Sequence, residues 1–103
     1  MMYKVTLEKP ALSDLRGIHS YIKNKLKAPE AARRIYQAIK TQVTTLDQNP
    51  HRCKLIDEEP FHSRGIRPLY VENFTAFFVI DENNKKVHIL RILYSHMQWQ
   101  DRL

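Results

Sequence analysis

The sequence is poor in cysteine and glycine, and it contains no long apolar run. Its single cysteine, Cys53, excludes an internal disulfide and fits a reducing compartment. Two glycines in 103 residues leave no flexible low-complexity linker, which argues against disorder. No apolar run approaches the roughly 20 residues that a membrane-spanning helix needs, and the first residues lack the apolar core of a signal peptide. We therefore expect one folded domain over residues 1–103, in the cytoplasm and with no membrane partner.

What the sequence has in excess is positive charge, with a formal net charge of +6. Residues 9–48 hold eight lysines and arginines against three acidic residues, which is +5 of that total. A basic surface of this kind favours an anionic partner, such as nucleic acid, an acidic protein segment or an anionic membrane surface. A solvated helix surface is the plain alternative, because lysine and arginine occupy outer faces in most proteins.

Hydrophobic periodicity predicts a strand and a helix at the start of the chain. Residues 3–7 alternate and are rich in β-forming side chains, which indicates a first strand. Residues 11–26 carry apolar side chains at spacings of three and four, the pattern of one buried helix face. That face consists of Leu12, Leu15, Ile18, Ile22 and Leu26. Gly17 weakens this helix by roughly 1 kcal/mol relative to alanine, and we expect its missing side chain to allow a close contact.

A second helix follows a break at residues 27–29, since proline is tolerated in a first helical turn. Its buried face comprises Ala32, Ile35, Ile39, Val43 and Leu46. Asn49-Pro50 ends the helix, because the residue before a proline disfavours the helical conformation. Two amphipathic helices with so short a connection predict a helical hairpin.

The second half of the chain predicts an irregular segment and three strands. Residues 51–65 show no clean period, and we expect them to form a surface loop. Tight turns should join the three strands into an antiparallel meander; the strands are expected at 66–71, 74–80 and 87–94. Pro68 confines the first of these strands to a sheet edge or a bulge, and Asn73 is expected to adopt a positive φ in the first turn.

The expected fold is therefore α+β: a small antiparallel sheet packed on an α-helical hairpin, in the order β-α-α-β-β-β with a short C-terminal helix. The hairpin supplies two apolar stripes and should cover one face of the sheet. An antiparallel sheet tolerates a partly open second face, so we expect function on that face and its rim.

Residues 87–103, VHILRILYSHMQWQDRL, end an apolar strand with a group of polar and aromatic side chains. Tyr94 and His96 are two positions apart, so a continuing strand would place them on one face as an acid/base pair. A half-buried aromatic residue and an exposed histidine are the plain alternative. This end of the strand is the main candidate site in the sequence.

Arg91 interrupts the apolar part of the same stretch, and a charge within a central strand must be paired or reach solvent. It either contacts a phosphate or a carboxylate of a target, or forms an ion pair with Glu72 or Asp81. Trp99 lies near the end of the stretch. Together with Met97 it either packs the tail onto the body or anchors a target.

The expected loop holds residue types that bind metals: His51, Cys53 and His62. Their spacing matches no common zinc signature, and no fourth ligand is evident. No base is identifiable beside Cys53 to activate its thiol as a nucleophile. We therefore expect no metal and no cofactor.

Three segments of the chain resemble one family. They are the start YKVTLEKPALSDLRGIHSYI, the helix PEAARRIYQAI before Asn49-Pro50, and the ending VHILRILYSHMQWQDRL. With the order of elements, they resemble the ParE/RelE toxin superfamily of bacterial type II toxin–antitoxin modules over nearly the whole chain. The ending is closer to ParE than to RelE. The resemblance implies a small antiparallel sheet on a helical hairpin.

The resemblance also implies one of two activities. ParE-like members poison DNA gyrase, whereas RelE-like members cut mRNA at the ribosome with basic strand residues and a C-terminal tyrosine or histidine. This chain offers Arg67 on its second strand, and Arg91, Tyr94 and His96 at the end. Thr75, however, stands where RelE-like members have a third-strand arginine, and threonine cannot stabilise the charge that develops on a phosphate. The resemblance therefore favours a ParE-like toxin, with an mRNA endoribonuclease as the alternative.

The partners that the resemblance implies are a cognate antitoxin in a hetero-oligomer and DNA gyrase, or the ribosome and mRNA in the alternative activity. Antitoxins of this kind are acidic where they bind. We therefore expect docking on the basic helical hairpin, through Arg16, Lys23, Arg33, Arg34 and Lys40. Target contacts are expected from Arg91, Tyr94, His96, Met97 and Trp99. A fold relative without toxicity that still binds an antitoxin is a third alternative.

Overall fold

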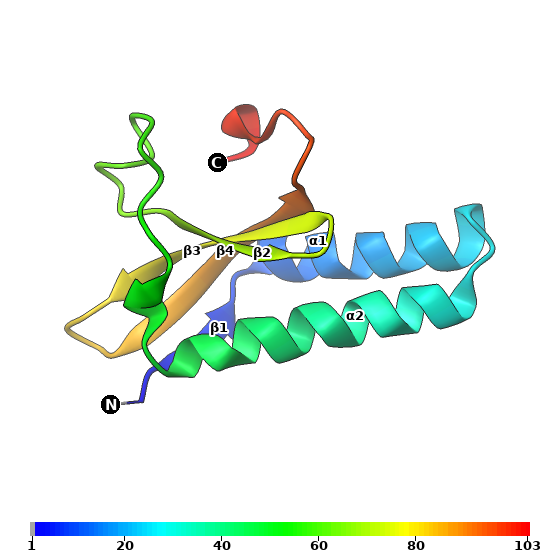
Figure 1. Ribbon diagram of the computed structural model, residues 1–103, viewed down its shortest axis with the longest axis horizontal. Coiled ribbons are helices and arrows are strands. Elements are labelled where there is room, and N and C mark those ends of the chain that lie inside the picture. The colour runs from blue at the N-terminus through cyan, green and yellow to red at the C-terminus, as the bar shows by residue number, and fades with distance from the viewer. Residues whose placement is uncertain (1) are drawn as a thin grey trace.

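The structure, a computed structural model, describes residues 2–103 as two helices packed on one face of a four-stranded sheet (Figure 1). The strands are β1 Lys4–Leu7, β2 Arg67–Val71, β3 Phe74–Asp81 and β4 Lys86–Tyr94. The helices are α1 Lys9–Ser20 and α2 Pro29–Thr44. The predicted α+β class and the order β-α-α-β-β-β are confirmed. The expected C-terminal helix is a single 3₁₀ turn at Trp99–Arg102.

The strands lie in the order β1-β4-β3-β2, and the last three form the predicted antiparallel meander. Strand β1 pairs with β4 in parallel, so the sheet is mixed rather than wholly antiparallel. The direction follows from the chain that comes next. Helix α1 starts at Lys9, directly after β1, and packs along the half of β4 that the short β1 leaves uncovered. Because β1 is parallel to β4, its end lies beside the middle of β4, where α1 begins.

Helix α1 begins with Pro10 in its first turn and continues into a π-helical turn at Tyr21–Lys25. The amide of Leu26 donates to the carbonyl of Tyr21 at 3.1 Å, a five-residue step that turns Leu26 out of the apolar stripe. Leu26 is 55% exposed and Leu12 is 36% exposed, so the expected burial of these two residues is wrong. The other stripe residues of both helices are buried or half-buried. No helix among residues 2–103 is long and apolar enough to cross a membrane.

The main core fills the space between the helical hairpin and the sheet. Alternate side chains of each strand point into it, and its centre holds Phe78, Ile89 and Ile39 with at most 1% of their surface exposed. The glycine expected to allow a close contact lies away from this core. An added Cβ at Gly17 would meet no atom within 4 Å, so that expectation is wrong.

The second face of the sheet is covered only in part, and it remains partly open at β2, where Tyr70 is 70% exposed. The irregular segment 53–66 and the C-terminal tail fold over it, around a small core of Phe61, Ile66, Phe77 and Leu93. Both segments lie on the side of the sheet opposite the helices (Figure 1). Neither segment has a hydrophobic period, because irregular chain buries single side chains rather than a stripe. In the β2–β3 turn the positive φ falls on Glu72, at 54°, rather than on Asn73.

Candidate functional site

An ion pair between Arg91 and Asp14 joins β4 to α1. The Asp14 carboxylate accepts hydrogen bonds from Nε and Nη2 of Arg91, at 2.7 and 2.8 Å. It also accepts the amide N–H of Ile92 at 3.0 Å, a strand-edge donor that lies beyond the end of β1. The Asp14 carboxylate raises the pKa of Arg91 above its ordinary value. The Arg91 side chain is therefore engaged within the protein, with Asp14 in place of the expected Glu72 or Asp81.

The C-terminal tail is fastened at three points to the body of the protein. Nη1 of Arg91 donates to the carbonyl of Arg102 at 3.1 Å, and Nη1 of Arg64 donates to that of Leu103 at 2.8 Å. Between these points the Trp99 ring packs against Phe61 and Phe77, with ring centroids 5.2 and 5.1 Å apart. Met97 joins the same small core. Trp99 and Met97 thus pack the tail onto the body while remaining partly exposed.

Tyr94 and His96 lie exposed where β4 gives way to the tail. The Tyr94 ring packs on Phe74, with centroids 4.5 Å apart, and is 38% exposed. Across the described chain, neither the Tyr94 hydroxyl nor the His96 ring has a hydrogen-bond or ion-pair partner. An acid/base pair in a catalytic site needs a third group to orient it. The structure brings the two residues near one another without such a group.

The remaining residues of a ribonuclease site do not converge on this end of the sheet. Thr75 is 2% exposed, and its hydroxyl is paired with that of Ser95 at 2.7 Å. On β3, Phe78 pairs with Arg67 and Phe74 pairs with Tyr94. These two β3 positions are four residues apart, which is roughly 13 Å along the strand. Nη1 of Arg67 donates to the carbonyl of Cys53 at 2.6 Å. Arg67 and Tyr94 are therefore too far apart along the strands to act on one phosphate.

A cleft of about 760 Å³ opens on the second face beside Trp99, over the Thr75–Ser95 hydroxyl pair. The cations at its rim are Arg52 and Lys54. Arg52 is engaged, because its guanidinium bonds the carbonyls of three residues at the end of the second helix: Thr45, Gln48 and Asn49. The cleft is thus lined by aliphatic, aromatic and hydroxyl side chains, and the positive charge of Lys54 is accompanied by the negative charge of Asp57.

The residues considered for metal binding lie apart. His51 Nε2 is 3.7 Å from Glu82, and His62 Nδ1 is 3.0 Å from the carbonyl of Ile56. No group of three potential ligands among residues 2–103 could hold a metal ion. Burial raises the pKa of the Cys53 thiol, which disfavours the nucleophilic thiolate.

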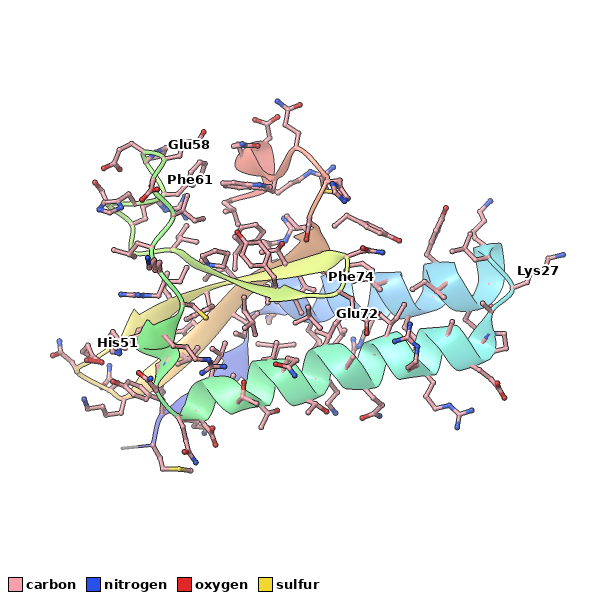
Figure 2. All side chains as sticks on the ribbon, viewed as in Figure 1. Lys27, His51, Glu58, Phe61, Glu72 and Phe74 are labelled. Carbon is pink, nitrogen blue, oxygen red and sulfur yellow. The ribbon has the colours of Figure 1, made fainter. Side chains whose placement is uncertain are left out.

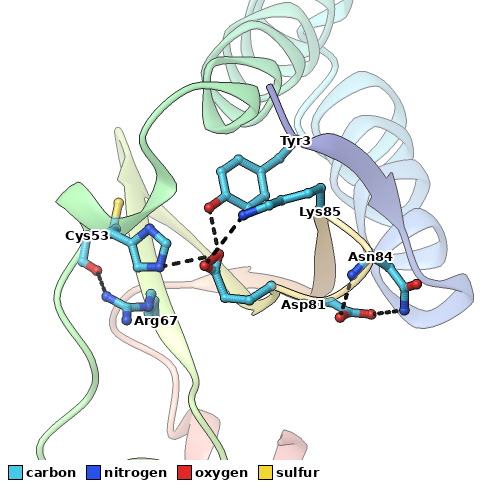
Figure 3. Close-up of polar contacts among 8 residues, drawn as sticks. Tyr3, Cys53, Arg67, Asp81, Asn84 and Lys85 are labelled. Carbon is cyan, nitrogen blue, oxygen red and sulfur yellow. Dashed lines mark hydrogen bonds and ion pairs between the residues drawn. The ribbon is translucent and has the colours of Figure 1, made fainter. Parts of the chain in front are cut away.

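Glu82 is the centre of a polar cluster that the sequence did not reveal (Figure 3). The Tyr3 hydroxyl donates to its carboxylate at 2.6 Å, and Lys85 Nζ lies 4.0 Å away. The Tyr3 hydrogen bond lowers the pKa of Glu82, and the same bond raises the pKa of Tyr3. The cluster ties the N-terminus to the β3–β4 turn. Tyr3 and Glu82 are 79 positions apart, and no local pattern signals such a pair.

A second candidate surface is a groove of about 420 Å³ between the helical hairpin and the edge strand β1, called here the edge groove. Its walls are mostly apolar, including Val5, Leu7, Leu12, Tyr36 and Ile39. Among the predicted antitoxin-binding residues, Lys40 alone lines it, with Nζ 5.5 Å from the centre of the Tyr36 ring. The exposed Leu12 is explained here, because its side chain forms part of the groove wall.

The other predicted antitoxin-binding cations do not gather in the edge groove. Arg34 pairs with Glu72 of the β2–β3 turn at 2.8 Å. Arg16, Lys23 and Arg33 are exposed on the outer surface of the hairpin. The basic side chains that the sequence grouped therefore belong to three separate places.

Residues 5–99 match the family described as the ParE toxin of the type II toxin–antitoxin system parDE. The chain belongs to the ParE toxin family. Comparison with curated protein sequences finds no match. The ParE match covers both candidate surfaces, from β1 at the edge groove to Trp99 on the tail.

Solved structures support membership of the ParE/RelE superfamily. A chain of the chromosomal ParDE system of P. aeruginosa is 30% identical, with a TM-score of 0.73, over 90% of this chain and 96% of that one. A chain of the RelBE2 toxin–antitoxin complex of Mycobacterium tuberculosis is 23% identical, with a TM-score of 0.67, over 91% and 99%. A mutant of the toxin RelE of E. coli in the free state has a TM-score of 0.65 at 11% identity, over 93% and 86%. The last two likenesses concern the fold.

Proposed function

We propose that this ParE family member is a cytoplasmic toxin that inhibits DNA gyrase by binding it, without cutting RNA. The observation that carries the proposal is the buried Thr75, whose hydroxyl is paired with Ser95 where an RNA-cutting member has a cation. Arg67 and Arg91 are engaged with Cys53 and Asp14, so neither guanidinium is free for a scissile phosphate. Cleavage through the 2′-hydroxyl needs both a base and such a cation.

The target-binding surface in this proposal is the exposed start of the tail. Tyr94 and His96 offer an aromatic ring and an imidazole that make no polar contacts within the described chain. Trp99 and Met97 anchor the same tail in the small second-face core. Arg91 acts as a positioning residue, because it holds α1 and the tail in place rather than facing solvent.

The test compares two activities of the purified protein. Inhibition of gyrase supercoiling with ribosome-bound mRNA left intact supports the proposal. Site-specific mRNA cuts that disappear in His96→Ala would replace it with the endoribonuclease alternative, and absence of both activities would favour a non-toxic antitoxin-binding protein. In the gyrase assay we expect His96→Ala to weaken inhibition about tenfold, the effect of one interface anchor. Gln98→Ala, an exposed neighbour on the same tail, is the matched control.

We also propose that an antitoxin neutralises the toxin by docking in the edge groove, forming a hetero-oligomer. The amide of Lys4 donates to the carbonyl of Lys85, just before β4, and that of Glu8 to Ile89 within β4, so the backbone of Val5 and Leu7 faces outward at the open edge. A partner segment can extend the sheet there while its apolar side chains enter the groove. Lys40 at the rim favours an acidic residue beside it in that segment, whereas Asp47, which also lines the groove, favours a polar or basic one. Arg16, Lys23, Arg33 and Arg34 remain candidate contacts for the rest of the partner.

Two exposed leucines allow a matched test of this docking site. Leu12 lines the edge groove, whereas Leu26 lies outside it at the end of the hairpin. Leu12→Gln should abolish growth rescue by a co-expressed antitoxin, such as the product of a short acidic reading frame beside this gene. Leu26→Gln should leave rescue intact. Equal loss of rescue in both variants, or in neither, would place the antitoxin elsewhere.

A further inference from the structure

The end of the helical hairpin farthest from the sheet carries a dense group of cations. This region, residues 16–33, is called here the hairpin tip, and its cations are Arg16, Lys23, Lys25, Lys27 and Arg33. All five are exposed, and Glu30 is the one acidic residue among them, so the tip carries a formal charge of +4. None of the five forms an ion pair or a side-chain hydrogen bond within residues 2–103. Lys27 projects into solvent at the extreme of the molecule (Figure 2).

The backbone at Lys27 is costly for a lysine. Its φ is 52°, in the left-handed region where glycine or asparagine is cheaper. Two other charged residues with positive φ, Glu72 and Lys85, each form an ion pair with a neighbour. At Lys27 the positive φ ends the helix, where the amide of Ala28 donates to the carbonyl of Ile22 at 3.0 Å. The Lys27 side chain has no ion-pair or hydrogen-bond partner among residues 2–103, so it is free for an external contact.

The shape of the tip limits what that contact can be. None of the five cations lines the edge groove or the cleft on the second face. A bound peptide needs such a groove for its side chains, whereas a phosphate backbone can be reached by lysines on a convex surface. Two exposed apolar residues, Tyr21 and Leu26, are too little to anchor the tip in a bilayer.

We propose that the hairpin tip binds the phosphate backbone of duplex DNA, independently of sequence. Its significance rests on the proposed function: gyrase holds a DNA segment, and a toxin bound to gyrase through its tail would bring the adjoining hairpin tip close to that segment. Charge complementarity carries the assignment. None of the five cations lines the edge groove, so DNA at the tip would leave that groove open, whereas Gly17 and Tyr21 of the tip lie beside Tyr94 and Met97 of the tail.

The test measures binding of the full chain to a fluorescent duplex of random sequence over a range of salt concentrations, with no gyrase present. The triple variant Lys23→Gln, Lys25→Gln, Lys27→Gln should bind more than tenfold more weakly at low salt. Each lost phosphate contact reduces the slope of log affinity against log salt by about 0.9, or roughly 2.7 for three contacts. The control triple variant removes the same charge from other parts of the surface and should keep most of the wild-type slope. It carries Lys4→Gln, Lys9→Gln and Lys54→Gln.

Lys27→Gly separates binding from structure. It relieves the strained φ and should raise the melting temperature, yet it should reduce the salt slope by about 0.9. Equal slopes for the tip and control triple variants would overturn the proposal. Tighter binding to vesicles of anionic lipid, or to polyglutamate, than to DNA would also overturn it. The DNA-binding assay contains no gyrase, so its result is independent of the gyrase assay. A protein that binds DNA as expected but does not inhibit gyrase in the separate assay would overturn only the proposed function.

Discussion

The two faces of the sheet are closed in different ways. Among residues 2–103, the helix-covered face holds 16 buried apolar residues in one continuous core, drawn mainly from both helices and from strands β2, β3 and β4. The second face holds 4, covered by the irregular segment 53–66 and the tail. The tail also contains Gln100, whose buried Oε1 has no protein partner among the described residues. Segments with few buried apolar contacts open at lower free energy than a core does. The second face should therefore be the more mobile of the two.

This difference matters for the proposed function, because His96 lies on the tail that forms the weaker cover, whereas the Tyr94 ring packs on Phe74 of the helix-covered core. Tyr94 and His96 begin the tail, and Arg91 fastens that tail to α1 through Asp14. The edge groove, in contrast, is built from the strong face. Antitoxin docking would then use a preformed surface, whereas target binding would use one that can adjust. The single tryptophan, Trp99, reports on the second face alone, which makes the two faces separable by experiment.

The largest effect is expected from Phe78→Ala, in the centre of the helix-covered core. Phe78 has no exposed surface, so its truncation should cost about 3–5 kcal/mol of the free energy of unfolding. Trp99→Ala, a larger truncation on the half-buried second face, should cost about 1–2 kcal/mol. Urea unfolding followed by far-ultraviolet circular dichroism measures both. Equal costs would show that the two faces are equally strong.

Asp14→Ala tests the link between the faces. It leaves the Arg91 guanidinium and the Ile92 amide without their shared acceptor, and should cost about 2 kcal/mol. The cost stays below that of a fully buried pair because the Arg91 and Asp14 side chains remain 22% and 14% exposed. Trp99 emission should shift to the red, since Arg91 also holds the tail. Ser13→Ala is the control, and an unshifted Trp99 spectrum in Asp14→Ala would argue against the link.

The regular half of the molecule was predictable from the sequence, and the irregular half was not. Apolar residues recur at the helical period in the stripe that contains Ile39 and Val43, and β-forming residues are concentrated in the run from Phe74. Each pattern therefore predicts its element from the sequence. Packing of Phe61 on Trp99 has no period, and the Asp14–Arg91 pair spans 77 positions. Such contacts are decided by the folded topology. The candidate site therefore could be located by residue type, but the engagement of its arginine could not.

Gly17→Ala should strengthen the helix-covered side by about 0.5–1 kcal/mol. The glycine is exposed within α1, and an added Cβ meets nothing within 4 Å, so the variant gains helix propensity without a clash. A small rise in melting temperature is expected. Gly65→Ala, at φ 76° in the irregular segment of the second face, should instead lower it. Matching shifts in both variants would contradict the backbone assignment.

The smallest expected effect is a pH dependence confined to the second face. Hydrogen bonds from the hydroxyl and the amide of Ser63 lower the pKa of the Glu59 carboxyl below its ordinary value of 4.5. A carboxyl whose folded pKa is lowered stabilises the fold above its ordinary pKa, and this contribution is lost as the pH falls through the lowered value. The Glu59–Ser63 turn positions Phe61, on which Trp99 packs. Trp99 fluorescence should therefore change below about pH 4.5 before the helical circular dichroism signal does.

Substitutions of Glu59 and of its neighbour Glu58 distinguish this effect from general acid unfolding. Asp81 and Glu82 also have lowered pKa values, held by Asn84 and Tyr3, so acid weakens the β3–β4 turn as well. Glu59→Gln should remove the early Trp99 transition and leave the later loss of helical signal in place. Glu58→Gln, one position away and also exposed, should retain both transitions. If the early transition persists in Glu59→Gln, the acid-sensitive contact lies outside the segment 53–66. The lower stability of the second face would then result from its packing alone.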